Sequence, residues 1–543
     1  VANQITKAAH KHPYKRSVIM PCGKDGLGNV TYSHYTFIEL EKRINQMACA
    51  LKQLGIKKGN RVLLFIKPSL DFSAIAFALF KMGAVPVLID PGMGIKKFLT
   101  AVKEVKAHAL IGIHIVHILR RLFRSKFSSI KIFISTSPLY LLTPSLPQTA
   151  LKMGVEFEAE KMQPSDTAAI LFTSGGTGKP KGVVYTHEIF IAQTQMLRTE
   201  FGLTPDDMDI PGFPLFALFS LAIGMSSCIP EMNPSKPAKA NPEKLVMNIS
   251  DQGATFVAGS PAIWQKVADY CIARNLTLPT IKYLVMFGAP ISVELHQKFA
   301  KILPNGTTYT PYGATECLPI TNMSGTEILK DTRKKTLEGM GTCVGLPVSQ
   351  VQVEIIPITD QDIAEISEIQ FLPAFSKGEI IVKSPVVTPE YFLLPEKTKA
   401  AKINDQGKLW HRMGDVGYKD DKGRLWFCGR KAHVVTIGKD TYFPIPVEAV
   451  FNQHPEVKRS ALVQLNSKQS EPGLVIERKD KQVNMSEEQR NLFFAELLKL
   501  AARYEHTKSI QKLFLYKDFP VDVRHNIKID RKLLSKWANT QKQ

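Results

Sequence analysis

A run of small and hydroxyl residues followed by two lysines stands out in the first half of the chain. Residues 171–182 read LFTSGGTGKPKG and continue the apolar stretch 168–172. A glycine-rich turn after a buried strand lets backbone N–H groups approach phosphate oxygens, and hydroxyls and a lysine add donors. The run is not a P-loop, because Pro180 stands where Ser or Thr would follow the lysine. We therefore interpret it as a phosphate-binding loop formed by Thr173, Ser174, Gly175, Gly176, Thr177, Gly178 and Lys181.

The charge of the chain favours an anionic partner or substrate. The 543 residues include 70 Lys and Arg against 49 Asp and Glu, a net charge of +21. These cations are scattered and not interleaved with stacking aromatics, which argues against nucleic-acid binding. A basic surface that concentrates polyphosphates or approaches an anionic membrane accounts for the same excess.

The cysteines and the apolar stretches indicate a cytoplasmic protein. The seven cysteines are odd in number and never form C-x-x-C, which argues against a disulfide framework or a zinc ribbon. The residues 1–12 lack the apolar core of a signal peptide. The apolar stretches 70–90 and 109–123 are interrupted by charge, glycine or histidine before they reach the length of a membrane span.

Strand and helix patterns alternate through the first part of the chain. The run 61–66 predicts a buried strand, 70–82 has helical period, and 85–89 predicts the next strand. A strand, a helix and a strand at this spacing form a βαβ unit of a parallel sheet. Further strands are expected at 168–172, 254–258 and 283–287.

The pattern changes in the last two hundred residues. From about 340, short strands at 354–356, 379–382 and 424–427 are separated by turn residues, which indicates a β-rich subdomain. After residue 429 the chain shows short strands at 434–436 and 460–463 and a helix at 486–503. We read this last segment as a separate small α+β domain.

Five segments in a fixed order carry a resemblance to a known family. Residues 172–182 resemble the [FY]-T-S-G-x-T-G-x-P-K-G signature of the acyl-adenylate-forming (AMP-binding) enzymes, which include acyl-CoA synthetases, adenylation domains and luciferases. The segment YGATE at 312–316 is similar to the family's Y-G-x-T-E, and MGDVG at 413–417 to its T-G-D. GRK at 429–431 resembles the start of the interdomain hinge, and KIDR at 528–531 the family's K-x-x-R.

The resemblance implies a fold and a nucleotide site. The fold would be α/β, with a large N-terminal domain (1–428) of two parallel-type sheets with helices plus a β-rich subdomain. A small mobile α+β domain (429–543) would follow. ATP would be the cofactor. Its adenine and ribose would be bound by Gly288, Ala289, Pro290, Tyr312, Gly313, Ala314, Asp415 and Arg430.

The resemblance also implies catalytic roles for three residues. Thr315 would offer a hydroxyl to the α-phosphate, and Glu316 would be a ligand of Mg²⁺, a cation that prefers oxygen ligands. Lys528 would bring positive charge to the transition state of adenylation, which is electrostatic stabilisation.

Two departures from the family pattern bear on the substrate and the acceptor. Where many acyl-CoA synthetases have P-L-F-H, this chain has Ala217 in place of the histidine, which leaves an apolar wall suited to an aliphatic chain. We expect Phe216, Ala217 and Phe219 to contact the substrate. The segment that helps form the thiol-acceptor tunnel in CoA ligases is eroded around 436–448, so coenzyme A is left open as a cofactor.

The chain also resembles a narrower group within the family. The segments FPLFALFSLAIGM, TPYGATECLP and HRMGDVGYKDDKGRLWFCGRK look like the bacterial olefin-pathway β-lactone synthetases, often labelled fatty-acid CoA ligases. The similarity implies an enzyme that adenylates a long-chain β-hydroxy fatty acid. The β-hydroxyl would then attack the acyl-adenylate and expel AMP, an intramolecular step favoured by effective concentration.

Three other interpretations stay open at this point. The first is a fatty acyl-CoA ligase that transfers the acyl group to CoA or a carrier protein. The second is a nucleotide-binding protein without activity, and the third, suggested only by the charge, is a nucleic-acid binder. Acyl chain length, stereochemistry, oligomeric state and peripheral membrane association cannot be read from the residues.

Overall fold

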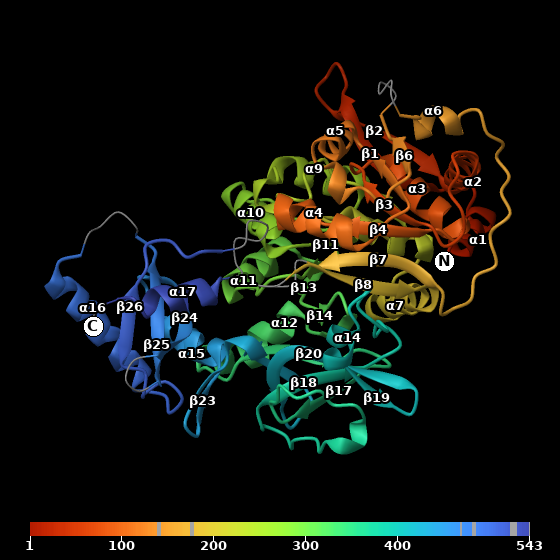
Figure 1. Cartoon of the computed structure of the whole chain (residues 1–543). Helices are drawn as coiled ribbons and strands as arrows, with labels where there is room; N and C mark the ends of the chain where they lie inside the picture. The colour runs from red at the N-terminus through yellow and green to blue at the C-terminus, as the bar shows by residue number, and fades with distance from the viewer. Residues whose placement is uncertain (138–142, 174–178, 467–469, 481–484, 522–528, 542–543) are drawn as a thin grey trace.

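The chain forms two mainly parallel sheets, an antiparallel sheet and a smaller C-terminal α+β part (Figure 1). The predicted α/β fold is therefore confirmed. All seven cysteines are free. The computed structural model describes residues 1–137, 143–173, 179–466, 470–480, 485–521 and 529–541.

The first parallel sheet contains the predicted βαβ unit. Its strand order is β6-β5-β3-β4-β7-β8, and all neighbours are parallel except the hairpin β7–β8. Its strands read as continuous apolar runs because helices cover both faces. They are β3 (Arg61–Phe65), β4 (Val85–Ile89), β5 (Ala109–Gly112), β6 (Ile132–Ser135), β7 (Thr167–Thr173) and β8 (Lys181–Thr186).

The helices of this sheet differ in how deeply they are buried. The helix α3 is buried on every side from Phe72 to Lys81, and Lys81 Nζ is satisfied by Glu41 Oε1 and Asn45 Oδ1, each at 2.6 Å. In contrast, α4 and α5 pack one face on the sheet, in a core that includes Leu63, Phe98 and Val116. The helices are α2 (Phe37–Gln53), α3 (Leu70–Lys81), α4 (Ile95–Glu104), α5 (His114–Leu122), α6 (Leu146–Ala150) and α7 (His187–Phe201).

The second parallel sheet has the order β13-β12-β11-β9-β10-β1-β2, with only β1–β2 antiparallel. The strand expected at 254–258 begins at Phe256, because Ala254 N still donates to Ile249 O at the end of the preceding helix. The strands are β1 (Arg16–Lys24), β2 (Val30–Thr36), β9 (Met208–Pro211), β10 (Ser226–Cys228), β11 (Phe256–Gly259), β12 (Tyr283–Met286) and β13 (Thr307–Tyr309). The helices are α1 (Asn3–Lys11), α8 (Ala217–Ile223), α9 (Pro242–Gln252), α10 (Pro261–Ala273) and α11 (Val293–Ile302).

The antiparallel sheet is the predicted β-rich subdomain, and it begins earlier than residue 340. Its order is β14-β15-β16-β21-β20-β18-β17, with β19 paired to β20. The early start arises because residues 312–322 form a hairpin that joins the sheet through β16. The strands are β14 (Tyr312–Ala314), β15 (Cys317–Asn322), β16 (Thr342–Pro347), β17 (Gln352–Ile356), β18 (Gly378–Lys383), β19 (Lys402–Asp405), β20 (Lys408–Lys419) and β21 (Leu425–Arg430). The short helices are α12 (Gly325–Glu327), α13 (Arg333–Leu337) and α14 (Pro395–Ala401).

The C-terminal part packs beside the antiparallel sheet, away from the N-terminus (Figure 1). Strand β21 ends at Arg430, two residues beyond the expected domain boundary at 428, which stays a prediction. The helix expected at 486–503 is α16, and Ser486 closes a capping box with Gln489. The elements are β22 (Val435–Ile437), β23 (Asp440–Tyr442), α15 (Pro444–Phe451), β24 (Val457–Asn466), β25 (Ser470–Arg478), α16 (Glu487–Ala501), β26 (Lys512–Leu515) and α17 (Arg531–Ala538).

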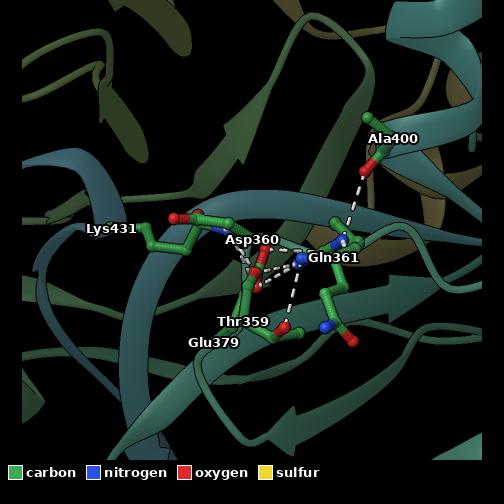
Figure 2. A network of polar contacts seen from close by, with 7 residues as sticks. Thr359, Asp360, Gln361, Glu379, Ala400 and Lys431 are labelled. Carbon is green, nitrogen blue, oxygen red and sulfur yellow. Dashed lines mark hydrogen bonds and ion pairs between the residues drawn. The ribbon is translucent and has the colours of Figure 1, made fainter.

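A buried ion-pair network connects Lys431, the last residue of the expected hinge segment 429–431, to the antiparallel sheet. Arg412 pairs with Glu379 at 2.7 Å, and both side chains are almost fully buried. Lys431 Nζ donates to Thr359 O at 2.6 Å and lies 3.4 Å from Glu379 Oε2. The remaining N–H groups of Arg412 donate to the backbone carbonyls of Thr359, Gln361 and Ala400, residues that Figure 2 labels. We call Glu379, Arg412, Lys431 and these carbonyls the ion-pair network.

Candidate active site

The candidate phosphate-binding loop joins the strands β7 and β8. Thr173 is the last residue of β7 and Lys181 the first of β8, while Ser174, Gly175, Gly176, Thr177 and Gly178 lie outside the described residues. Lys181 Nζ lies 4.6 Å from the centroid of the Tyr391 ring. Burial lowers the pKa of Lys181, and the carboxylate of Glu316 opposes that shift. The lysine therefore stands close to the predicted metal ligand.

Tyr312, Asp415 and Arg430 come together from three strands. Tyr312 Oη donates to Asp415 Oδ2 at 2.6 Å, and Arg430 Nη1 lies 2.9 Å from Asp415 Oδ1. Asp415 is buried, and burial raises its pKa although Arg430 and Tyr312 act in the opposite direction. The pairing of β20 with β21 places Asp415 opposite Arg430, so the sheet register sets this contact. The three residues predicted to hold adenine and ribose thus lie in one place.

At two positions of the predicted nucleotide site, the backbone conformation or the close packing requires glycine. Gly288 follows β12 with φ +89°, a conformation that residues with a Cβ rarely adopt. A Cβ on Gly313 would lie 2.9 Å from Cys317 O, inside the tight β14–β15 hairpin that also carries Ala314. Ala289 is half-buried, whereas Gly288 and Pro290 are exposed. The loop is therefore accessible at the carboxyl end of a parallel strand, where α/β folds bind ligands.

Thr315 and Glu316 are held by tyrosines from other parts of the chain. Tyr185 Oη on β8 donates to Thr315 O at 2.6 Å. Tyr391 Oη donates to Glu316 Oε1 at 2.7 Å, and the backbone N–H of Thr388 donates to Glu316 O at 2.9 Å. The hairpin loop and the predicted phosphate-binding strands are thereby fixed to each other.

A buried lysine beside Glu316 was missed by sequence reasoning. Lys402 begins β19, and its Nζ has no hydrogen-bond partner among the described residues. Burial lowers its pKa from 10.5 to about 8, and the charge of Glu316 opposes the shift. We call Lys181, Glu316, Tyr391 and Lys402 the Glu316 cluster. Nothing in the run EKTKAAK at 396–402 distinguishes Lys402 from a surface lysine.

The predicted apolar wall lies at the start of α8. Ala217 is fully buried, and the rings of Phe216 and Phe287 are 4.9 Å apart, which connects the wall to the residue before Gly288. Phe219 stacks on Phe190 at 4.6 Å. Phe219 also lines an entirely apolar cavity of about 40 Å³ between α3, α7, α8 and the first parallel sheet. A cavity of this volume has room for only a few atoms, so it indicates apolar surroundings and no chain length.

Lys528, the predicted catalytic lysine, lies outside the described residues. The arginine of the same K-x-x-R motif is described, and it has a structural contact. Arg531 Nη2 donates to Glu448 Oε2 at 2.6 Å, and Glu448 Oε1 also accepts from Leu462 N at 2.9 Å. Arg531 therefore connects α17 to α15 and β24.

The arrangement suits a nucleotide with a phosphate tail. Tyr312, Asp415 and Arg430 offer an aromatic ring, a carboxylate and a cation, and the Glu316 cluster offers two ammonium groups and a carboxylate near the phosphate-binding strands. Within the described ranges no group of three His, Cys, Asp or Glu residues could hold a metal ion. Mg²⁺ in nucleotide sites needs only one or two carboxylates besides substrate phosphates, and Glu316 fits that role.

Comparison with known proteins assigns the chain to a family. The AMP-binding enzyme family matches residues 5–392, which is more than half of the chain. The chain belongs to this family, so the family inferred from the five motifs is confirmed. It is an enzyme of the AMP-forming ligase class.

Two relatives are similar over the full length of the chain. An olefin beta-lactone synthetase of Xanthomonas campestris pv. campestris is 38% identical, with 100% of this chain and 98% of the relative covered. A second olefin beta-lactone synthetase, of Stenotrophomonas maltophilia, is 37% identical with the same coverage. A putative acyl-CoA ligase of Bacillus subtilis is more distant, at 27% identity over 83% of this chain and 84% of the relative.

Solved structures share the fold. ATP-bound MatB from Rhodopseudomonas palustris superposes with a TM-score of 0.77 at 20% identity and covers 99% of both chains. The anthranilate CoA ligase AuaEII, in complex with anthranoyl-AMP, has a TM-score of 0.79 at 18% identity and covers 99% of this chain and 96% of the other. At these identities the likeness establishes the fold.

Proposed function

We propose that this enzyme uses ATP and Mg²⁺ to activate a long-chain β-hydroxy fatty acid and then closes it to a β-lactone. In the first step the carboxylate attacks the α-phosphorus of ATP, and pyrophosphate leaves. In the second step the β-hydroxyl oxygen attacks the acyl carbon, the bond to the phosphate breaks, AMP leaves and the hydroxyl proton is released. No thiol is needed.

The main support for the proposal is the difference in sequence identity and coverage between the β-lactone synthetases and the acyl-CoA ligase. Identity to the olefin beta-lactone synthetases is 37–38% over the full chain, against 27% over 83% of it for the putative acyl-CoA ligase. The segment around 436–448, expected to bear on the acceptor, lies within this full-length match. This difference favours lactone closure over thioester formation.

The geometry around Tyr312, Asp415 and Arg430 supports ATP as the activating substrate. The ring of Tyr312 would stack on adenine, a contact that every base can make. Asp415 would accept hydrogen bonds from the ribose hydroxyls, with Arg430 beside it at 2.9 Å. The bond of Tyr312 to Asp415 holds both side chains ready at this place.

The charges of the Glu316 cluster support the proposal that this part of the site binds the phosphates of ATP. Glu316, oriented by the hydrogen bond from Tyr391, would hold Mg²⁺, and the ion would neutralise phosphate charge. Lys181 and Lys528 would add positive charge, and Thr315 would donate to the α-phosphate. Positive groups fixed before the reaction stabilise developing charge without reorganisation.

The apolar wall formed by Phe216, Ala217 and Phe219 at the start of α8 supports the proposal that the substrate is aliphatic. Ala217 places a methyl group where many acyl-CoA synthetases have a histidine, and Phe216 and Phe219 continue the apolar surface. Ligand pockets with few polar groups select apolar ligands. A fatty acid with a polar group only near its carboxylate matches this surface.

The test compares fatty acids with and without a β-hydroxyl, in the presence and absence of CoA. We expect repeated turnover and pyrophosphate release with the β-hydroxy acid alone, and a product mass equal to the acid minus one water. Turnover that requires CoA and ignores the hydroxyl would establish the fatty acyl-CoA ligase instead.

A variant of the catalytic lysine tests the activation step. Lys528→Ala should lower acid-dependent pyrophosphate release by about 100-fold or more, the size typical of a lost transition-state contact, while ATP still binds. Lys532→Ala, an exposed lysine of α17, is the matched control and should keep full activity. Equal activity of both variants would remove Lys528 from the mechanism.

A further inference from the structure

The outer face of α5 is apolar. Ile115, Ile118 and Leu122 are 43%, 45% and 70% exposed, although such side chains are normally buried. Their spacing of three and four residues places them in one stripe along the helix. Val116 and His117 are buried on the opposite side, so the helix already has its core face. We call the three exposed residues the α5 stripe.

The residues around the α5 stripe are strongly basic. Between 95 and 131 the chain has nine Lys and Arg residues and a single carboxylate, that of Glu104. One of the nine, Arg120, lies over the ring of Phe133 at 3.7 Å and belongs to the packed side. The exposed cations are Lys96, Lys103, Lys106, Arg121, Arg124 and Lys131.

The helices α4 and α5 cover the same face of the first parallel sheet. The connections β4–α4–β5 and β5–α5–β6 advance in one direction across the sheet, and right-handed crossovers then place both helices on one face. Both pack into one core with Leu63, Val87 and Leu110 beneath them. The helices lie on the same side in Figure 1, drawn in orange. The apolar stripe and the cations on or next to these helices, Lys96, Lys103, Arg121 and Arg124, therefore belong to one surface of the molecule.

We propose that this surface docks on a membrane that contains anionic lipids. Helices that lie in a membrane interface combine large apolar side chains on one face with Lys and Arg beside them. Anionic head groups attract basic residues at short range, which matches the excess of cations between 95 and 131. No helix in the described part of the chain is long and apolar enough to span a bilayer, so the protein would lie on the surface.

A lipid surface fits better than a protein partner. The cores of protein interfaces are depleted in lysine, because buried ammonium groups lose their hydration. A bilayer interface keeps head groups and water around the cations while the stripe enters the apolar layer. The proposal concerns a surface distinct from the nucleotide site, and it stands whether or not the proposed reaction is correct.

The experiment is co-sedimentation of the full chain with two kinds of vesicle. One contains phosphatidylcholine alone, and the other phosphatidylcholine mixed with phosphatidylglycerol. We expect at least about tenfold tighter binding to the anionic vesicles, lost at high salt because the charges are then screened. Arg121→Gln/Arg124→Gln and Ile118→Gln/Leu122→Gln should each weaken this binding by about tenfold.

Matched variants separate the surface from general effects. Leu492→Gln replaces a similarly exposed leucine on α16, and Lys266→Gln/Lys301→Gln removes two cations from α10 and α11. Both should bind the vesicles like the wild type, and all variants should unfold at the same temperature. Equal binding to both vesicles, no binding, or equal losses in all variants would overturn the proposal. Self-association abolished by Ile118→Gln/Leu122→Gln, without vesicle binding, would replace the membrane by a second copy of the chain.

Discussion

The ion-pair network in the antiparallel sheet and the Glu316 cluster, which joins that sheet to strand β8, differ in how completely their charges are paired. In the ion-pair network, Arg412 meets Glu379 through two nitrogens, at 3.1 and 2.7 Å, and its remaining donors reach backbone carbonyls. In the Glu316 cluster, Lys402 is just as buried, but its ammonium group has no hydrogen-bond partner among the residues described. One group is saturated by the protein, and the other keeps donors unused.

The difference separates a structural role from a binding role. Buried charges are tolerated when every donor and acceptor is matched, and each unmatched one costs free energy. A site that is to receive phosphates must keep positive charge available, so part of its interactions are absent without a ligand. We therefore expect changes in the ion-pair network to alter stability, and changes in the Glu316 cluster to alter activity.

The largest effect on stability is expected for Arg412→Met. The change leaves the carboxylate of Glu379 buried, and among the described residues Lys431, at 3.4 Å, is then its one remaining ion-pair partner. The free energy of unfolding should fall by about 3–5 kcal/mol, which is measured by denaturant unfolding. Lys419→Met, which breaks a half-exposed pair with Glu354 in the same sheet, is the control and should cost less than about 1 kcal/mol. Equal losses would mean that burial of the network does not matter.

The largest effect on activity is expected for Glu316→Gln. The amide keeps the shape of the side chain and can still accept from Tyr391, but it removes the negative charge. Pyrophosphate release should fall about 100-fold, while the free energy of unfolding changes by less than about 2 kcal/mol. Glu294→Gln on the surface of α11 is the control. A large loss of stability with little loss of activity would reverse the assignment of the two groups.

The residues that carry these predictions were not equally visible in the sequence. Tyr312, Glu316 and Asp415 stand in short motifs whose order along the chain predicted the family, and the structure brings Tyr312 and Asp415 within 2.6 Å. Tyr391 and Lys402 stand in no motif. Their approach to Glu316 depends on long-range packing: Tyr391 bridges to Val183, and β19 folds onto β20. Local patterns predict strands and helices, but they contain no information on such contacts.

The burial of Lys402 also could not be predicted from the residues around it. Lys402 follows two other lysines in a polar helix, a context that predicts a solvated side chain. It is buried because β19 pairs with the long strand β20 and directs the side chain inward beside His411. The parallel sheets were easier to predict, because a continuous apolar run is typical of a strand whose two faces are both buried.

A smaller and opposite effect on stability is expected for Lys402→Met. Methionine fills a similar volume without a charge, so the free energy of unfolding should rise by about 1–2 kcal/mol. Pyrophosphate release should fall about tenfold, because positive charge near Glu316 is lost. Lys399→Met, three residues earlier on α14 and 66% exposed, should change neither quantity. A destabilised Lys402→Met variant would show that the protein does satisfy this charge.

The smallest effect on activity and stability is expected for Tyr391→Phe. The same change at a second tyrosine, Tyr418, serves as the comparison. Tyr391 donates to Glu316 in the site, whereas Tyr418 donates to Met340 O at 2.9 Å within the core of the antiparallel sheet. Each phenylalanine variant removes one hydroxyl and should lower the free energy of unfolding by about 1 kcal/mol. Only Tyr391→Phe should also lower pyrophosphate release, by about three- to tenfold, because Glu316 then loses the donor that orients it. If both variants slowed the reaction equally, Tyr391 would act only through stability, and its hydroxyl would have no separate role in orienting Glu316.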